Sequence, residues 1–214
     1  MSAEYQGSDP FSSPAFNSLR EFVMESSRAE KGTGDLEEFE RELHRRMMTF
    51  EADLVGRQLA RYDLDVPEVQ VEGQLFRRKD KYKEQYCGLA GTFEIERTLY
   101  VPRSRGGKAI CPLEMRAGIV EGTWTPLAAR LMARAVAITT PKEAEALFEE
   151  FGGMKPSTSS LDRLPKRLSE KWEEQREVFE DELRSLEPVP REAATVAVSL
   201  DGVQVPMKDG ERAE

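Results

Sequence analysis

The sequence predicts an α+β protein that is mainly α-helical, and three patterns carry this prediction. Apolar residues recur at helical spacing through residues 36–54, and residues 92–101 alternate between apolar and polar side chains. From residue 125 onward, proline and glycine residues mark the ends of a series of helical segments. These patterns divide the chain into five segments, namely 1–34, 35–75, 76–122, 123–187 and 188–214.

Composition and targeting signals narrow the class of protein. Hydrophobic residues make up 39% and charged residues 33% of the 214 residues, and the mean hydropathy is -0.58, which excludes an integral membrane protein. The longest apolar stretch, 133–138, is far shorter than the roughly 20 residues of a spanning helix. Residues 1–19 lack the basic and apolar regions of a secretory signal. Because Cys87 and Cys111 fit a reducing cytosol, we expect a cytoplasmic protein with no membrane partner.

The net charge of -9 is unevenly distributed along the chain. Residues 1–76 carry 8 basic and 16 acidic side chains, a net charge of -8. Residues 77–140 carry 12 basic and 6 acidic side chains, a net charge of +6, and the remaining residues carry 11 and 18, a net charge of -7. A basic middle between acidic flanks permits a polyanionic partner, although basic faces are often only solvated.

The first two segments are predicted to be a disordered leader and a helical region. Residues 1–34 are rich in serine, proline and glycine, which is typical of disorder. A helix then begins after Asp35, a good N-cap. Its apolar residues form either the core-facing side of a helical domain or a coiled-coil dimer contact, and His44 beside them is interpreted as structural. The apolar residues recur at spacings of 3, 4, 4, 3 and 4: Leu36, Phe39, Leu43, Met47, Phe50 and Leu54.

Residues 76–122 are predicted to form a small antiparallel β-unit. The alternation over 92–101 places Phe93 and Leu99 on one face of a strand, and Thr98 and Tyr100 on the other. Residues 82–87 form the partner strand, joined through a turn at 88–91. Residues 108–111 follow a glycine-rich basic turn and are predicted to add a third short strand.

Three helices are predicted between residues 123 and 187. Thr125 and the proline after it begin a helix that runs over 127–138. A capping box at 140–143 begins the next helix, which stops at Gly152. The last helix covers 161–186, and Pro165 is expected to kink it or to shift its start.

The end of the chain is predicted to form a β-hairpin. Two apolar runs flank Asp201 and Gly202, a sequence typical of hairpin turns. A lone two-stranded hairpin is marginally stable in water, so we expect these strands to begin a domain that the chain does not contain. Asp201 itself is either the first residue of an ordinary turn or a carboxylate ligand for Mg²⁺ at a strand end.

Two other places are candidate DNA-binding sites. Residues 140–168 have the layout of a helix-turn-helix, in which the second helix enters the major groove, or of an ordinary helical hairpin. The basic β-unit either follows a nucleic-acid backbone, with its tyrosines interleaved, or is a solvated sheet edge. The residues that would contact DNA are Lys155, Ser157, Thr158, Ser160, Arg163, Lys166 and Arg167 in the first site, and Arg103, Arg105 and Lys108 in the second, beside the basic side chains of 77–83.

The order of several motifs resembles the N-terminal half of bacterial insertion-sequence transposases of the ISKra type. The similarity lies in Gly91-Thr-Phe-Glu-Ile-Glu-Arg-Thr-Leu-Tyr100, in Cys111-Pro-Leu-Glu114, in Trp124-Thr-Pro126, and in Val196-Ala-Val-Ser-Leu-Asp-Gly-Val-Gln-Val-Pro206. It covers roughly residues 76–214 and includes the helix pair at 140–167. These transposases belong to the DDE superfamily, whose catalytic domain has a ribonuclease-H-like fold that holds two divalent metal ions.

The resemblance implies that residues 188–214 are the first β-hairpin of a truncated ribonuclease-H-like domain, with Asp201 as its first catalytic acid and Mg²⁺ ligand. Mg²⁺ would then serve two-metal phosphoryl transfer only in a complete catalytic domain. With one acid of three, the chain is expected to be inactive alone. Relatives place a Cys-x-x-Cys pair after the second strand, whereas 101–106 here contain no cysteine, so we predict no zinc.

The resulting functional prediction is a DNA-binding N-terminal portion of a truncated transposase that recognises the terminal inverted repeats of its element. Its partner would be double-stranded DNA in the bacterial nucleoid, with a homodimer as a further possibility. The alternative is an acidic helical interaction module that dimerises through residues 36–54 and does not bind DNA.

Overall fold

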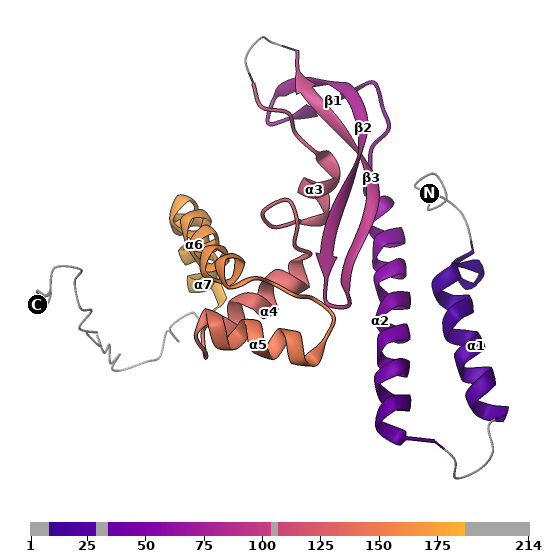
Figure 1. Ribbon diagram of the computed structural model, residues 1–214. Coiled ribbons are helices and arrows are strands. Elements are labelled where there is room, and N and C mark those ends of the chain that lie inside the picture. Colours follow the sequence, from indigo (N-terminus) through magenta and orange to yellow (C-terminus); the bar gives the residue numbers. More distant parts are fainter. Residues whose placement is uncertain (1–8, 29–33, 104–106, 187–214) are drawn as a thin grey trace, which may run out of the picture. The chain divides into compact units, whose positions relative to one another are not determined.

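The computed structural model describes residues 9–28, 34–103 and 107–186. The chain forms two compact units, residues 1–169 and 170–214, and each is described by itself. The described residues confirm an α+β fold that is mainly helical and contains one three-stranded antiparallel sheet (Figure 1). Among the described helices, none has the length and apolarity that a membrane crossing requires. The hairpin predicted around Asp201 lies outside the described residues.

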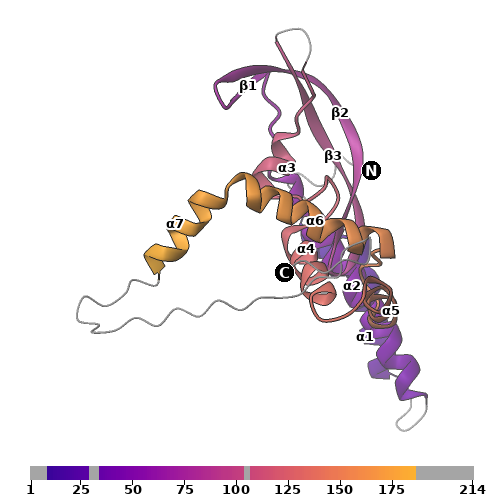
Figure 2. The same ribbon diagram turned by 90° about the vertical axis from the view of Figure 1, so that its left-hand side faces the viewer.

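The sheet has the strand order β1-β2-β3 (Figure 2). Strand β2 (Gln74–Gly88) and strand β3 (Gly91–Pro102) form the predicted hairpin, with a bulge between Arg78 and Asp80. The predicted third strand at 108–111 is wrong in extent, because only an isolated bridge joins Ile110 to Tyr100. The third strand is instead β1 (Glu68–Val71), which pairs with the start of β2.

Strand β1 corrects the prediction that residues 35–75 are a helical region. The two residues between β1 and β2, Glu72 and Gly73, have φ values of 49° and 78°. Two-residue turns with positive φ at both positions match the twist of antiparallel strands. Gly73 adopts this backbone easily, because glycine has no Cβ. Asn-Gly and Asp-Gly are the usual pairs in such turns, and Glu72-Gly73 occupies the same two positions here.

The alternation predicted for β3 holds only for its first half. Phe93 and Ile95 are buried, but so are Thr98 and Tyr100, which were predicted to face solvent. The chain between α2 and β1 covers them: the Asp63 carboxylate accepts hydrogen bonds from Thr98 N (2.9 Å) and Oγ1 (2.8 Å). The Tyr100 hydroxyl donates to the carbonyl oxygen of Leu64 (2.6 Å) and accepts from the N–H group of Val66 (3.2 Å), so both faces of this end of the sheet are buried.

Helix α2 (Leu36–Ala60) begins where the sequence predicts, with the Asp35 side chain accepting a hydrogen bond from Glu37 N (2.9 Å). Its C-terminal half packs on the sheet through Ala52, Gly56, Leu59 and Ala60. The helix and strand approach closely at Gly56, where an added Cβ would lie 3.1 Å from the Phe93 ring.

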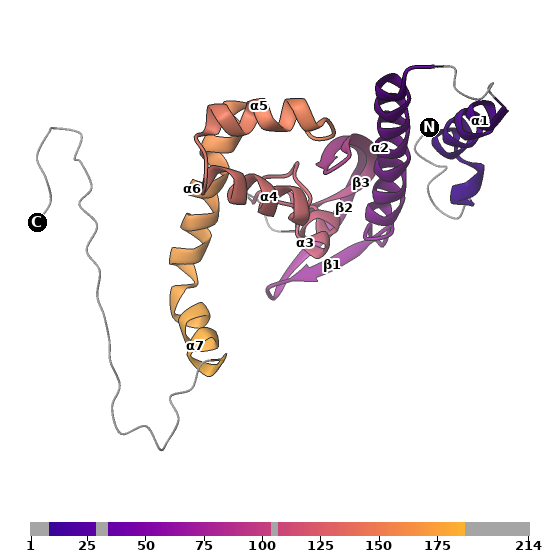
Figure 3. The ribbon, with the colours of Figure 1, turned by 90° about the horizontal axis from the view of Figure 1, so that it is seen from below.

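The predicted disorder of residues 1–34 is wrong for residues 10–28. Pro10–Ser12 form a 3₁₀ turn, and Pro14–Arg28 form helix α1, which lies beside α2 (Figures 1 and 3). The rings of Phe16 and Phe50 are 5.3 Å apart, and those of Phe22 and Phe39 stack at 5.4 Å. Serine and proline content suggested disorder, whereas phenylalanines that have partners on α2 make this segment helical.

Helix α3 (Pro112–Ala117) brings a carboxylate to the sheet. Glu114 accepts a hydrogen bond from the Tyr86 hydroxyl (2.9 Å) and forms an ion pair with Arg97, which also pairs with Glu84. Burial raises the pKa of Tyr86, and the hydrogen bond to Glu114 raises it further. Through Tyr86, this polar network adjoins the core cluster formed by α2, α3, β2 and β3.

Of the remaining helices, the first two follow the predicted boundaries closely. In chain order, these helices are α4 (Pro126–Val136), α5 (Pro141–Phe151), α6 (Thr158–Glu174) and α7 (Arg176–Leu186). The predicted single helix over 161–186 is two helices that separate at Gln175, and α6 continues past Pro165. In the second unit the rings of Trp172 and Phe179 stack with centroids 4.9 Å apart.

Candidate nucleic-acid interface

Helices α4, α5 and the first turns of α6 form a three-helix unit around a common core. Figure 3 shows α5 running crosswise to α6. The helix pair predicted from sequence is therefore packed against a third helix, which is the arrangement of several DNA-binding domains of the helix-turn-helix class. The buried residues that join the three helices are Ala128, Ala129, Met132, Ala144, Met154, Leu161 and Leu164.

The turn between α5 and α6 is held against the β2–β3 turn. Met154 N donates a hydrogen bond to the carbonyl oxygen of Leu89 (2.9 Å), and a Cβ added to Gly153 would lie 2.3 Å from that same oxygen. His44 Nε2 lies 3.2 Å from the carbonyl oxygen of Phe151 at the end of α5. This contact is consistent with the structural role expected for His44. The turn that leads into α6 is thus held by contacts to the sheet and to α2.

Ser157 and Thr158, two of the predicted DNA-binding residues, hold the N-terminus of α6. Ser157 Oγ accepts a hydrogen bond from Ser160 N (3.3 Å). The carboxylate of Glu145 on α5 accepts hydrogen bonds from the Thr158 hydroxyl and from Thr158 N (3.0 Å). These hydrogen bonds hold the pKa of Glu145 below its usual value. Glu145 therefore places a carboxylate at the helix N-terminus, where backbone N–H groups favour an anion.

The four predicted basic residues on α6 and just before it are exposed, and three of them pair with an acidic side chain. Arg163 Nε lies 3.1 Å and Arg167 Nε 3.7 Å from the same carboxylate oxygen of Glu121. Lys166 pairs with Asp162 one turn before it (2.6 Å). The exposed side chain of Lys155 has no hydrogen-bond or ion-pair partner among the described residues. Four basic side chains therefore gather on the first turns of α6 and just before them.

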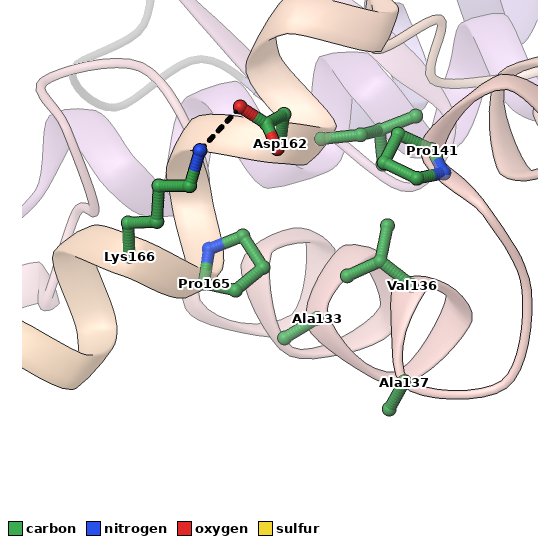
Figure 4. Close-up of a pocket in the computed structure, with 8 residues that line it drawn as sticks. Ala133, Val136, Ala137, Pro141, Asp162, Pro165 and Lys166 are labelled. Atoms are coloured by element: carbon green, nitrogen blue, oxygen red, sulfur yellow. Dashed lines mark hydrogen bonds and ion pairs between the residues drawn. The ribbon is translucent and has the colours of Figure 1, made fainter. Parts of the chain in front are cut away.

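A shallow pocket of about 310 Å³ lies between α4 and the start of α6 (Figure 4). Its walls are apolar, and its only charged side chains are Asp162 and Lys166, which pair with each other. Figure 4 shows Pro165 and Val136 on opposite sides of it.

The β-unit contributes less to the interface than the sequence indicates. Tyr86 and Tyr100 are buried in the core, so of the three interleaved tyrosines only Tyr82 is exposed. Arg103 lies 3.5 Å from Glu68, and Lys108 is exposed. Arg105 lies outside the described residues. Among the basic residues of β2, three are in ion pairs: Arg78 and Lys81 with Asp65, and Lys83 with Glu94.

No metal-ligand set occurs in the part of the chain that the structure describes, where no three His, Cys, Asp or Glu side chains are grouped to hold an ion. Cys87 and Cys111 are free thiols buried in two different core clusters. Burial raises the pKa of the Cys87 thiol to about 11. Asp201, the predicted Mg²⁺ ligand and catalytic acid, lies outside the described residues.

Sequence reasoning missed three residues near this interface. Arg130 and Arg134 of α4 are exposed and have no ion-pair partner among the described residues. Their spacing on an amphipathic helix, opposite Ala128 and Met132, was a usable signal. Glu121 was missed because it lies 42 residues before Arg163, and no local pattern connects them.

No protein-family model, no curated protein and no solved structure matches this chain.

Proposed function

We propose that this chain binds duplex DNA through the basic face of α6. The observation that carries the proposal is the three-helix unit, in which α6 follows a turn held against the sheet and exposes Lys155, Arg163, Lys166 and Arg167. Arginine side chains contact phosphates and base edges of DNA. In helix-turn-helix proteins, a helix held in a fixed position brings such side chains into the major groove.

Glu121 has a defined part in this proposal. Its side chain is only 14% exposed, and it pairs with both Arg163 and Arg167. In the free protein this carboxylate orients the two guanidinium groups. When the chain binds DNA, phosphate groups replace the Glu121 carboxylate as the partner of both arginines. A guanidinium group has five hydrogen-bond donors and can bind one phosphate with two of them.

A salt titration of DNA binding tests the proposal. We expect affinity for a short duplex, measured by fluorescence anisotropy between 50 and 200 mM salt, to fall linearly with salt on logarithmic axes, with a slope of about 0.9 for each neutralised phosphate. The double variant Arg163→Gln with Arg167→Gln removes two contacts, so the slope should fall by about two. Glu121→Gln should strengthen binding, because it removes the negative charge that both arginines contact.

The matched control is Arg20→Gln, which removes an exposed arginine from α1 and should leave the slope unchanged. Binding by the double variant equal to that of the wild type would place the DNA contact elsewhere. Absence of any salt-dependent binding would reject a DNA-binding function altogether.

The wider proposal is that this DNA-binding unit belongs to a transposase and recognises the terminal inverted repeats of an insertion sequence. It is supported by the motifs that resemble the ISKra type, and by the helix pair that follows the β-hairpin in the expected order. The proposed role of Asp201 as a Mg²⁺ ligand rests on the resemblance alone. A binding comparison tests this proposal. We expect higher affinity for a duplex that carries an inverted-repeat end than for a duplex of the same composition in scrambled order.

A further inference from the structure

Helix α2 contains an internal repeat of eleven residues. Residues 36–46 (LEEFERELHRR) and 47–57 (MMTFEADLVGR) place equivalent residues at equivalent positions: Phe39 and Phe50, Glu40 and Glu51, and Leu43 and Leu54. Eleven residues make three turns of 3.67 residues, close to the 3.6 of a straight helix. Equivalent residues therefore lie in a straight line along α2.

The repeat leaves an apolar stripe that nothing in the described chain covers. The sheet packs on the opposite side of the C-terminal half of α2, and α1 covers the phenylalanine side. The remaining apolar side chains form the α2 stripe: Leu36, Met47 and Leu54 are 38% to 69% exposed, and Leu43 between them is half-buried. Glu40 and Glu51 flank this α2 stripe, and neither has an ion-pair or hydrogen-bond partner among the described residues.

Helix α4 presents a second exposed stripe with the opposite charge. Its inner side is buried in the three-helix core, whereas Leu127, Leu131 and Ile138 are 42%, 39% and 72% exposed. These three residues, with Ile138 just past the end of the helix, form the α4 stripe. Arg130 and Arg134 lie beside them without ion-pair partners in the described chain.

We propose that the α2 stripe of one copy of this chain docks antiparallel on the α4 stripe of a second copy. In this register Leu36 faces Ile138, Leu43 faces Leu131 and Met47 faces Leu127, while Glu40 faces Arg134. The parallel register places Leu43 opposite Arg134 and Glu40 opposite Leu131, so it would leave both charges against apolar side chains. Charge complementarity thus selects both the occupant and its direction.

The α4 stripe fits a protein partner better than DNA. Phosphates are bound by the arginines alone, whereas three exposed aliphatic side chains gain stability only by losing contact with water. Two copies can make this contact twice, with α2 of each copy on α4 of the other, and the result is a closed dimer with a two-fold axis. If only one of the two contacts forms between a given pair, further copies add head to tail. The proposal is independent of DNA binding by α6.

Disulfide trapping tests the register directly. Glu40→Cys and Arg134→Cys chains, mixed in equal amounts and oxidised, should give a cross-linked pair that contains one chain of each kind. The native thiols are buried, so they do not compete. A cross-link in the Glu40→Cys sample alone would show α2 against α2, one in the Arg134→Cys sample alone would show α4 against α4, and either result overturns the proposal.

A charge exchange provides the second test, by sedimentation of the full chain over a range of concentrations. Glu40→Lys and Arg134→Glu should each raise the dissociation constant for self-association about tenfold or more, because each places like charges together. The chain that carries both changes should recover association. The control Glu38→Lys alters an exposed acid on another side of α2 and should have no effect.

Three results would contradict the proposal: a wild-type chain that stays monomeric at every concentration, an Arg134→Glu chain that associates like the wild type, and a double variant that does not recover. If Arg134→Glu weakens duplex binding while self-association is unchanged, the α4 stripe contacts DNA instead. Circular dichroism of each variant should match that of the wild type, since all the altered side chains are exposed.

Discussion

At the scale of single residues, contacts between distant parts of the chain decide what each position requires. Gly153 follows a helix and has a φ of 76°, which the glycine pair at 152–153 already suggested. Gly153 also lies so close to the carbonyl oxygen of Leu89 that a side chain would not fit. Leu89 lies 64 residues earlier in the chain, so no pattern in the sequence around Gly153 indicates this contact. Tyr100 is similar, because the strand pattern placed it in solvent and the backbone of 64–66 buries it.

Gly153→Ala should lower the free energy of unfolding more than Gly73→Ala does. The two glycines have the same backbone conformation, but only Gly153 lies close to another part of the chain. Gly73 is the matched control, since its φ is 78° and an added Cβ would meet nothing within 4 Å. We expect a loss of about 1–2 kcal/mol for Gly73→Ala from the left-handed backbone alone. Gly153→Ala should lose at least about 1 kcal/mol more, because its Cβ would meet a backbone oxygen.

Urea unfolding of the two variants measures this difference. Equal losses for Gly153→Ala and Gly73→Ala would show that the α5–α6 turn moves away from the β2–β3 turn at little cost. In that case the position of α6 is not fixed by this contact.

At the scale of secondary-structure elements, helix ends are the best-predicted features. Asp35 and the capping box at 140–143 are satisfied as the sequence indicates, because both involve residues two or three positions apart. The start of α6 is different: its cap combines Ser157 with Glu145 from another helix. The order of α1 also depends on another helix, since its phenylalanines stack on α2.

The contact between Glu145 and Thr158 should make stability depend on pH. A carboxyl group whose pKa is lower in the folded chain stabilises the fold above its unfolded pKa of about 4.3, and this contribution is lost as pH falls through the folded value. We therefore expect Glu145→Gln to reduce the free energy of unfolding at pH 7 and to differ little from the wild type at pH 3.

Denaturant unfolding at several pH values measures this effect. The control is Glu149→Gln on the same helix, where the exposed carboxylate has no partner among the described residues and the change should be neutral at each pH. A difference between Glu145→Gln and the wild type that is the same at pH 7 and pH 3 would contradict an ionic role for Glu145.

At the scale of the whole molecule, the first unit contains two core clusters that meet in strand β2. Tyr86 belongs to the cluster of α2, α3 and the sheet, and the adjacent Cys87 belongs to the cluster of the three helices. Cys87 also pairs with the chain at Trp124 through backbone hydrogen bonds to Thr123 and Thr125. Adjacent residues of one strand therefore connect the two clusters, and we expect them to unfold together.

Leu113→Ala tests this coupling from the α3 side. Leu113 is fully buried, so its loss should cost about 2–5 kcal/mol. The chain also contains Trp172, so fluorescence is measured in a Trp172→Phe background where it reports Trp124. If the unit unfolds as one, the change in Trp124 fluorescence and the loss of helical circular dichroism should shift to lower denaturant by the same amount. The control is Met115→Ala, at an exposed position of the same helix. A fluorescence transition of Trp124 that does not move with Leu113→Ala would show that the two clusters unfold separately.

The sequence by itself determined the α+β class, the β2–β3 hairpin, the starts of α2 and α4, and both ends of α5. Each of these depends on side chains a few residues apart, or on alternation along a single strand, which a linear pattern records. It also located the exposed basic residues of α6, because charge on a helix face is visible in the spacing.

Only the tertiary structure decided which of those charges are already paired and which apolar stripes remain uncovered. Glu121 reaches Arg163 across 42 positions, Glu145 reaches Thr158 across 13, and Asp63 reaches Thr98 across 35. The same is true of α1 and of β1, which are ordered by partners rather than by their own propensities. Burial and pairing are properties of segments brought together by folding, so the order of residues along the chain does not contain them in readable form.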